Sequence, residues 1–271
     1  MANLGLAGKV AIITGAGSRA EGIGNGRAAA ILLAREGVSV ALIDAVVRNA
    51  EATKAMIDAE GGASLVVEAD VAVAKSCETA VAAVVAAWGR LDILVNNVGV
   101  GGTGGTAVDL DLEAWDRDLR INVTSMMLMA RYAIPQMRRQ NGGAIVNIAS
   151  VAGLRGGHAG LLYPTSKGAV VNMTRAMAAH HGPEGIRVNC IAPGMVYTPM
   201  VYSRGNGLSD ELRESRRKRS LLQTEGTGWD VGNGVLYLVS DMARWVTGVI
   251  HPIDAGATAG TVGSPSPPPD K

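Results

Sequence analysis

The fold is decided by the stretch Lys9-Val-Ala-Ile-Ile-Thr14-Gly15-Ala-Gly17-Ser18-Arg19-Ala-Glu-Gly22-Ile23-Gly24-Asn-Gly26. It joins a short apolar run, typical of a buried strand, to a glycine-rich turn, and an alanine-rich helical pattern follows. Glycines at such a turn let the backbone approach a pyrophosphate, whose charge then faces the amides at the start of the helix. The stretch therefore predicts the first strand and helix of a dinucleotide site.

Outside this stretch, short apolar runs alternate with helical patterns along the chain. Strands are expected at Val10 to Thr14, Val38 to Ile43, Ser64 to Glu68, Ile93 to Val95, Ala144 to Ala149, Arg187 to Ile191 and Val249 to Ile253. Helices are expected at Gly24 to Glu36, Ala50 to Glu60, Lys75 to Trp88, Leu112 to Arg139, Leu161 to His181 and Gly228 to Ser240. Because this alternation requires right-handed crossovers, it predicts an α/β fold with a doubly wound, mostly parallel sheet.

The composition predicts one domain. The chain has 271 residues, with neither an internal repeat nor a change of composition that would mark a linker, so residues 1–262 are expected to fold together. With no Phe and 48 % apolar residues, the core must consist mainly of Ala, Val, Leu, Ile and Met. The segment from Gly263 to Lys271 is rich in Pro and is expected to be a disordered tail.

Charge and cysteine content exclude several classes of function. The 25 Lys and Arg residues nearly balance the 24 Asp and Glu residues, which gives no reason to expect binding to nucleic acid or to an anionic membrane. Cys77 and Cys190 lie far apart and form no metal-ligand or redox spacing, so we expect small, reduced core residues and no metal. No apolar stretch reaches the roughly 18 residues that span a bilayer. A cytoplasmic protein is expected.

An acidic residue stands where a dinucleotide site needs one. Asp44 follows Gly24 by twenty residues, at the end of the second expected strand, where it can accept hydrogen bonds from the adenosine ribose. Its charge would repel a 2′-phosphate, so NAD is expected as the cofactor and NADP is less favoured. Arg19 in the glycine turn could instead meet a 2′-phosphate, but a solvated loop arginine is the preferred interpretation.

The segment Tyr163-Pro-Thr-Ser-Lys167 carries candidate chemistry, together with Ser150 thirteen residues upstream. In a helix, Tyr163 and Lys167 leave the same face. A free phenol titrates at about 10, and a nearby ammonium favours the phenolate and lowers that pKa. Ser150 could hydrogen-bond a substrate oxygen, so the three side chains suggest redox chemistry between a carbonyl and an alcohol. Taken alone, however, the pentapeptide is a common pattern on surface helices.

From about Leu6 to Gly256, the chain resembles the short-chain dehydrogenase/reductase family. The resemblance depends on several motifs in family order: Thr14-Gly15 through Gly22-Ile23-Gly24, Asp70-Val71, Asn96-Asn97-Val98-Gly99, Asn122, Ser150, Tyr163 with Lys167, and Pro193-Gly194-Met195-Val196-Tyr197-Thr198. Their joint occurrence removes the doubt about the pentapeptide. The resemblance implies a seven-stranded Rossmann-type sheet, usually in a homotetramer.

The resemblance also implies a role for each site residue. Tyr163 would be the general acid/base, and Lys167 would lower its pKa while hydrogen-bonding the nicotinamide ribose. Ser150 would polarise the substrate carbonyl, and Asn122 would hold a water that links Lys167 to solvent. Together with the glycine turn and Asp44, the predicted cofactor-binding residues are Gly15, Gly17, Ser18, Gly22, Ile23, Gly24, Asp44, Asp70, Val71, Asn97, Gly99, Tyr163, Lys167, Pro193, Gly194, Val196 and Thr198.

The sequence departs from the family pattern mainly in the glycine turn. Six residues, Ala16 to Glu21, separate Gly15 from Gly22, where three are usual. Val98 replaces the usual alanine of its motif, and Trp229 stands where a proline or small residue often begins the penultimate helix. The longer turn leaves open which amides would bind the pyrophosphate.

The identity of the small-molecule substrate stays open. The segments expected to line its pocket are Val100 to Thr106, Ala152 to Leu162 and Met195 to Leu212. An apolar wall of Leu154, Leu161, Met195, Tyr197, Met200 and Tyr202 would suit a cyclic or aromatic secondary alcohol. The basic run from Arg213 to Arg219 could instead steer an anionic substrate, such as a 3-oxoacyl thioester or a sugar acid, although such runs usually face solvent. A regulator that binds NAD(H) without turnover is a further, weaker alternative.

Overall fold

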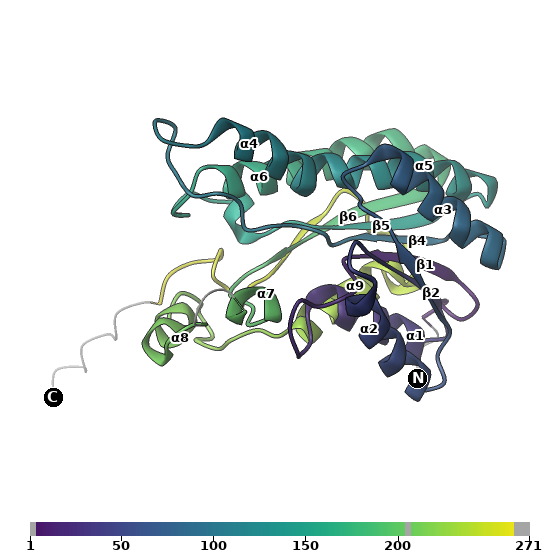
Figure 1. Cartoon of the computed structure of the whole chain (residues 1–271), viewed down its shortest axis with the longest axis horizontal. Helices are drawn as coiled ribbons and strands as arrows, with labels where there is room; N and C mark the ends of the chain where they lie inside the picture. Colours follow the sequence, from purple (N-terminus) through teal and green to yellow (C-terminus); the bar gives the residue numbers. More distant parts are fainter. Residues whose placement is uncertain (1–3, 204–206, 263–271) are drawn as a thin grey trace, which may run out of the picture.

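The computed structural model of the protein describes residues 4–203 and 207–262, so the expected tail from Gly263 lies outside the described residues. Within those ranges the chain forms one seven-stranded parallel sheet in the order β3-β2-β1-β4-β5-β6-β7 (Figure 1). The strands are β1 (Val10–Thr14), β2 (Ser39–Asp44), β3 (Ser64–Glu68), β4 (Ile93–Asn96), β5 (Gly143–Ile148), β6 (Ile186–Pro193) and β7 (Ile250–Ile253). The sheet confirms the predicted α/β fold, and each strand lies within two residues of its predicted bounds.

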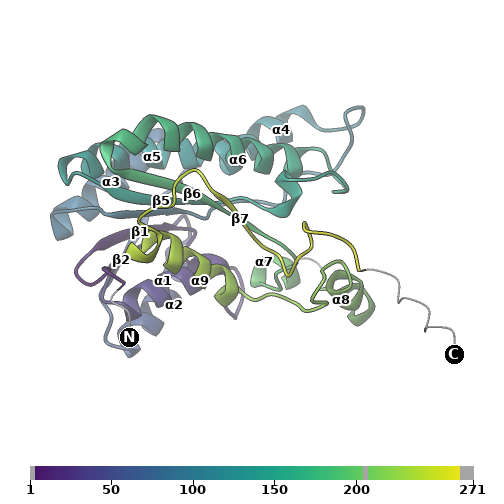
Figure 2. The same cartoon turned by 180° about the vertical axis from the view of Figure 1, so that it is seen from behind.

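Helices cover both faces of the sheet (Figures 1 and 2). One face carries α1 (Asn25–Arg35), α2 (Val47–Ala59) and α9 (Gly228–Val239). The other carries α3 (Ala74–Trp88), α4 (Leu112–Leu119), α5 (Ser125–Arg139) and α6 (Leu162–His181). Two short helices that the periodicity did not predict, α7 (Pro199–Tyr202) and α8 (Asp210–Arg217), follow the carboxyl end of β6.

The long helix expected from Leu112 to Arg139 contains an irregular turn. A π-helical segment, Arg120–Thr124, separates α4 from α5. Segments of this kind insert a wider turn into an α-helix and often occur at functional sites. The apolar spacing resumes beyond the segment, which is why the sequence pattern alone did not reveal it.

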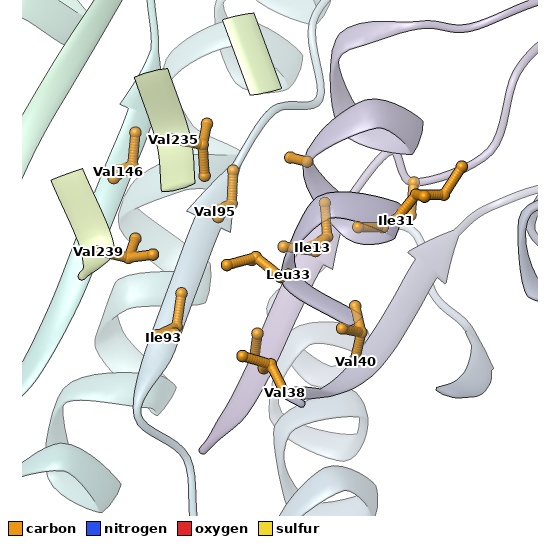
Figure 3. Close-up of a cluster of buried hydrophobic side chains, with 14 of the residues drawn as sticks. Ile13, Ile31, Leu33, Val38, Val40, Ile93, Val95, Val146, Val235 and Val239 are labelled. Atoms are coloured by element: carbon orange, nitrogen blue, oxygen red, sulfur yellow. The ribbon is translucent and has the colours of Figure 1, made fainter. Parts of the chain in front are cut away.

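Aliphatic side chains fill the space between the layers. Figure 3 shows Ile13 and Val95 of the sheet beside Leu33 of α1 and Val235 of α9, and all four are buried. A fully buried side chain of this size contributes roughly 1.5–3 kcal/mol to folding relative to an exposed one. Cys77 and Cys190 are both buried, as predicted, and they are not joined to each other.

The start of α1 packs tightly on the glycine turn. A Cβ at Gly26 would overlap the carbonyl oxygen of Gly15 and would lie 2.5 Å from Asn97 Nδ2. Asn97 Nδ2 in turn donates to the carbonyl oxygens of Thr14 (3.1 Å) and Gly15 (3.0 Å). Helix α1, the turn and the end of β4 are therefore held against one another at the centre of the sheet.

Candidate active site

A cavity of about 1100 Å³ lies at the carboxyl ends of the central strands, where the strand order reverses between β1 and β4. In open α/β sheets this switch point is where ligands bind. The predicted site residues that line the cavity are Gly15, Gly17, Ser18, Gly24, Asp44, Asp70, Val71, Asn97, Gly99, Ser150, Tyr163, Lys167, Pro193, Gly194, Val196 and Thr198. Three others, Gly22, Ile23 and Asn122, are not part of this lining within the described chain.

The carboxylate of Asp44 is held by backbone amides of the glycine turn and of the loop after β2. Its Oδ2 accepts from the N–H of Gly17 (3.1 Å), and its Oδ1 accepts from the N–H of Val46 (3.0 Å). A Cβ at Gly17 would lie only 2.6 Å from Asp44 Oδ2, so a glycine is required for this approach. Each carboxylate oxygen keeps further acceptor capacity for a ligand at the cavity wall.

The first turn of α1 faces the same cavity. Gly24 precedes the helix and provides no side-chain cap, and Gly24, Asn25 and Gly26 all line the cavity. Uncapped amides at a helix start favour a phosphate or another anion. A close glycine backbone, uncapped amides and a carboxylate at the end of β2 therefore suit the pyrophosphate and ribose of a dinucleotide.

The glycine turn is fixed by side chains that carry no sequence motif. Arg27 of α1 is buried and donates to the carbonyl oxygen of Gly22 (2.6 Å) and to Thr53 Oγ1 (2.9 Å). Thr53 then donates to the carbonyl oxygen of Ala16 (2.8 Å). At the far end of the turn, Tyr202 of α7 donates to the carbonyl oxygen of Glu21 (2.6 Å).

These contacts explain the positions of two predicted residues. Gly22 lies directly under the hydroxyl of Tyr202, where a Cβ would overlap it. The side chain of Ile23 packs against the hydrophobic core. Both residues shape the turn from outside the cavity, whereas Gly15, Gly17, Ser18, Arg19 and Gly24 line it.

Tyr163 and Lys167 lie one turn apart on α6, and both line the cavity. The ammonium of Lys167 lies 5.8 Å from the centre of the Tyr163 ring and donates to the carbonyl oxygen of Ile148 (3.0 Å). Lys167 is only 4 % exposed, and this burial lowers its pKa to about 8. A positive charge is thus placed beside the phenol, as the four-residue spacing predicts.

Asn122 lies behind Lys167, in the π-helical segment. It is fully buried: its Oδ1 accepts from the N–H of Val100 (2.7 Å), and its Nδ2 donates to the carbonyl oxygen of Val100 (3.0 Å) and to Ser166 Oγ (3.1 Å). A Cβ at Gly99 would lie 3.2 Å from Lys167 Nζ and 3.3 Å from Asn122 Oδ1. The ammonium and the amide therefore border the same small space.

Ser150 and His158 border the cavity near Tyr163. Ser150 Oγ accepts from the N–H of Ala152 (3.2 Å), which fixes the side chain at the start of a short 3₁₀ turn, Val151–Gly153. Its hydroxyl hydrogen can still be donated to a ligand. The exposed ring of His158 lies 5.0 Å from the ring of Tyr163, centre to centre.

The expected substrate wall is only partly present. Of the six side chains named for it, Met195 and Met200 line the cavity, while Leu154, Leu161, Tyr197 and Tyr202 do not. The ring of Tyr197 lies 3.9 Å from the Arg213 guanidinium carbon instead. The lining of the cavity also includes five arginines, Arg19, Arg48, Arg155, Arg216 and Arg219.

Two kinds of site were searched for in the described part of the chain. Residues 4–203 and 207–262 contain no group of three or more His, Cys, Asp or Glu side chains placed to hold a metal ion. No helix in these ranges combines the length and the apolarity needed to cross a membrane.

Comparison with known proteins shows the family. A family model described as enoyl-(acyl carrier protein) reductase matches residues 17–258. The 2-(S)-hydroxypropyl-CoM dehydrogenase 3 of Xanthobacter autotrophicus is 38 % identical over 253 residues, which cover 93 % of this chain and 97 % of that protein. The meso-2,3-butanediol dehydrogenase of Serratia marcescens is 34 % identical over 251 residues, 93 % of this chain and 95 % of that one.

A solved structure extends the similarity to the fold and the cofactor. A 7α-hydroxysteroid dehydrogenase complexed with NADH and 7-oxo glycochenodeoxycholic acid superposes with a TM-score of 0.86 and 32 % identity. The match covers 94 % of this chain and 96 % of that one. The chain therefore belongs to the short-chain dehydrogenase/reductase family, as an oxidoreductase of alcohols that uses a nicotinamide cofactor.

Proposed function

We propose that the protein interconverts a secondary alcohol and its ketone with NAD(H), using Tyr163 as general acid and base. The observation that carries the proposal is the convergence of Tyr163, Lys167 and Ser150 in one cavity with Asp44 and the uncapped start of α1. The cofactor, when bound, supplies or accepts the hydride.

The chain's own side chains move the proton. In oxidation, Tyr163 removes the proton of the substrate hydroxyl as the carbon loses hydride, and in reduction the same phenol protonates the developing alkoxide. The buried ammonium of Lys167 stabilises the phenolate. Ser150 donates a hydrogen bond to the substrate oxygen and orients it. Asn122 borders the space beside Lys167 Nζ, which supports its role in holding a water that passes the proton toward solvent.

The position of Asp44 favours NAD. Asp44→Ala removes the ribose acceptor and the charge that repels a 2′-phosphate, and Arg19 and Arg48 line the same cavity. We expect the ratio of kcat/KM for NAD over NADP to fall roughly ten- to a hundredfold, as for a lost hydrogen bond to a charged group. Initial rates with both cofactors measure the ratio, and Glu51→Ala on the exposed face of α2 is the matched control. An unchanged ratio would contradict the role of Asp44.

Turnover tests the proposal directly. The purified protein is assayed with a panel of secondary alcohols and ketones, with both cofactors, by the absorbance of NADH at its characteristic wavelength. The panel includes cyclic, aromatic and short-chain alcohols and 3-oxoacyl thioesters. Hydroxy acids are added because the similar hydroxysteroid dehydrogenase is complexed with an acid. Tight NADH binding without turnover of any member would favour the non-catalytic regulator instead.

The assembly of the protein is proposed from family resemblance, and its location and its lack of nucleic-acid or membrane binding are proposed from its composition and charge. We propose a cytoplasmic homotetramer that acts on a small molecule and binds neither nucleic acid nor membrane. Sedimentation of the purified protein measures its assembly. The predicted single domain of residues 1–262 is tested by limited proteolysis, which should leave one resistant core.

A further inference from the structure

Within the described residues, the basic run from Arg213 to Arg219 contains cations that are paired with carboxylates and cations that are not. Arg213 is paired with Glu225 (2.6 Å), Arg217 with Glu214 (2.6 Å), and Lys218 with Glu214 (3.6 Å). Each of these three cations is therefore paired with a carboxylate, and Arg217 and Lys218 share Glu214.

Arg216 and Arg219 differ from their neighbours in two ways. Both line the cavity that contains Tyr163, and neither pairs with a carboxylate within the described residues. Arg216 lies in the last turn of α8, and Arg219 lies just beyond the helix, where its N–H donates to the carbonyl oxygen of Arg216 (3.2 Å). Two arginines without a carboxylate partner in the described part of the chain thus border the cavity that contains Tyr163.

The guanidinium of Arg216 contains a buried hydrogen-bond donor that is not satisfied within the described residues. Its Nη2 donates to the carbonyl oxygen of Val196 (3.3 Å), but its Nε is buried and has no hydrogen-bond partner among the described residues. An unsatisfied buried donor destabilises a folded protein unless a ligand completes it.

The charges around Arg216 are also unbalanced. Burial lowers its pKa, the neighbouring charge of Arg219 lowers it further, and Glu225 raises it. Glu225, however, is already engaged by Arg213. An anion between Arg216 and Arg219 would relieve their mutual repulsion and accept from the unpaired Nε–H.

We propose that Arg216 and Arg219 form a subsite for an anionic group of the substrate, a carboxylate, sulfonate or phosphate, held away from the reacting carbon. The proposal depends on the proposed function only in placing the substrate hydroxyl at Tyr163. The pyrophosphate of the cofactor is the other possible source of such an anion. Arg216 is bonded to Val196, which is predicted to bind the cofactor at its nicotinamide end, and not to the glycine turn that is predicted to bind the pyrophosphate. Because the substrate must reach the nicotinamide, this position favours an anionic group of the substrate over the pyrophosphate.

Binding of small anions to the NAD-saturated protein tests the subsite without turnover. Isothermal titration compares propanesulfonate, cyclohexanecarboxylate and benzoate, each with its neutral amide, in wild type and in variants. We expect at least one acid to bind more tightly than its amide. Arg216→Gln should raise the Kd of that acid roughly ten- to a hundredfold, as for a lost charge-assisted hydrogen bond. Arg219→Gln, at an exposed residue, should raise it a few-fold.

Matched variants separate the subsite from general charge and from folding. Lys218→Gln removes one positive charge from the same segment and should leave the Kd of the acid close to that of wild type. Arg216→Lys keeps the charge without the planar fork and should bind with intermediate affinity. Thermal unfolding shows whether each variant is folded. If Arg216→Gln does not fold, Arg219→Gln still tests the subsite, because Arg219 is exposed.

Three outcomes would overturn the subsite. The first is that no acid binds more tightly than its amide, and the second is that Arg216→Gln and Lys218→Gln give the same Kd for the acid. The third is that the variants raise the Kd of NAD and leave the Kd of the acid unchanged, which would assign Arg216 and Arg219 to the pyrophosphate. None of these results would contradict the proposed function, because the probes carry no hydroxyl to oxidise. Failure of the proposed function would appear only in the assay with the alcohol panel.

Discussion

Tyr163→Phe is expected to lower kcat by roughly 10²- to 10⁴-fold, the range for loss of a general acid/base. The substitution removes one oxygen atom, the one from which the proton is taken or returned, and keeps the ring beside His158. Fluorescence titration with NADH should give a Kd close to that of wild type, because Asp44 and the start of α1 remain in place. The loss should therefore appear in kcat and not in cofactor binding.

Tyr237→Phe is the matched control for this variant. Tyr237 lies on α9, is 38 % exposed and does not line the cavity. Loss of its hydroxyl should leave kcat unchanged. Near-wild-type turnover in Tyr163→Phe would rule out the phenol as the proton carrier, and an equal loss in both variants would point to a change in folding.

The fold was predictable from sequence because its strands have both faces buried. Ile12 and Leu94 are fully buried between helix layers, so their strands are nearly continuous apolar runs. Helices that bury one face are equally predictable, because their apolar residues recur every three or four positions. The π-helical segment around Asn122 was not predictable, because one wider turn leaves the apolar spacing on either side unchanged.

The site was predictable where chemistry fixes the spacing. Tyr163 and Lys167 must share a helix face, and Asp44 must end the second strand, so sequence distance alone places them. Arg27 shows the opposite case. It anchors the glycine turn through Gly22 and Thr53, and these partners meet only in the folded chain. No local pattern distinguishes it from a surface arginine.

The basic run from Arg213 to Arg219 is a second case in which the sequence does not predict the partner of each side chain. In sequence, Arg213 and Arg216 look alike, and both were assigned to one charged stretch. Only the tertiary structure shows that Glu225 pairs with Arg213, while Arg216 turns toward the cavity. Which charges are balanced depends on carboxylates brought in by folding, and therefore cannot be read from the run itself.

Lys167→Met is expected to remove most activity and, at the same time, to stabilise the protein at neutral pH. Activity falls because the phenolate of Tyr163 loses its neighbouring positive charge. Stability rises because the folded protein no longer buries an ammonium. Burial lowers the pKa of Lys167 from 10.5 to about 8, and that difference corresponds to about 3 kcal/mol of unfolding free energy. Loss of the hydrogen bond to Ile148 offsets about 1 kcal/mol of the gain.

The pH dependence distinguishes this explanation from simple repacking. Between the pKa of about 8 in the folded state and 10.5 in the unfolded state, the unfolded chain binds more protons at Lys167, so wild-type stability rises with pH over this window. Below pH 8 the wild type carries the full destabilisation. In urea unfolding of the cofactor-free proteins, the unfolding free energy of Lys167→Met should therefore exceed that of wild type at pH 7, and the difference should be lost by pH 10. Lys218→Gln, at a lysine 64 % exposed, should show no such dependence on pH. A constant difference between wild type and Lys167→Met at all pH values would mean that the ammonium is not the source of the instability.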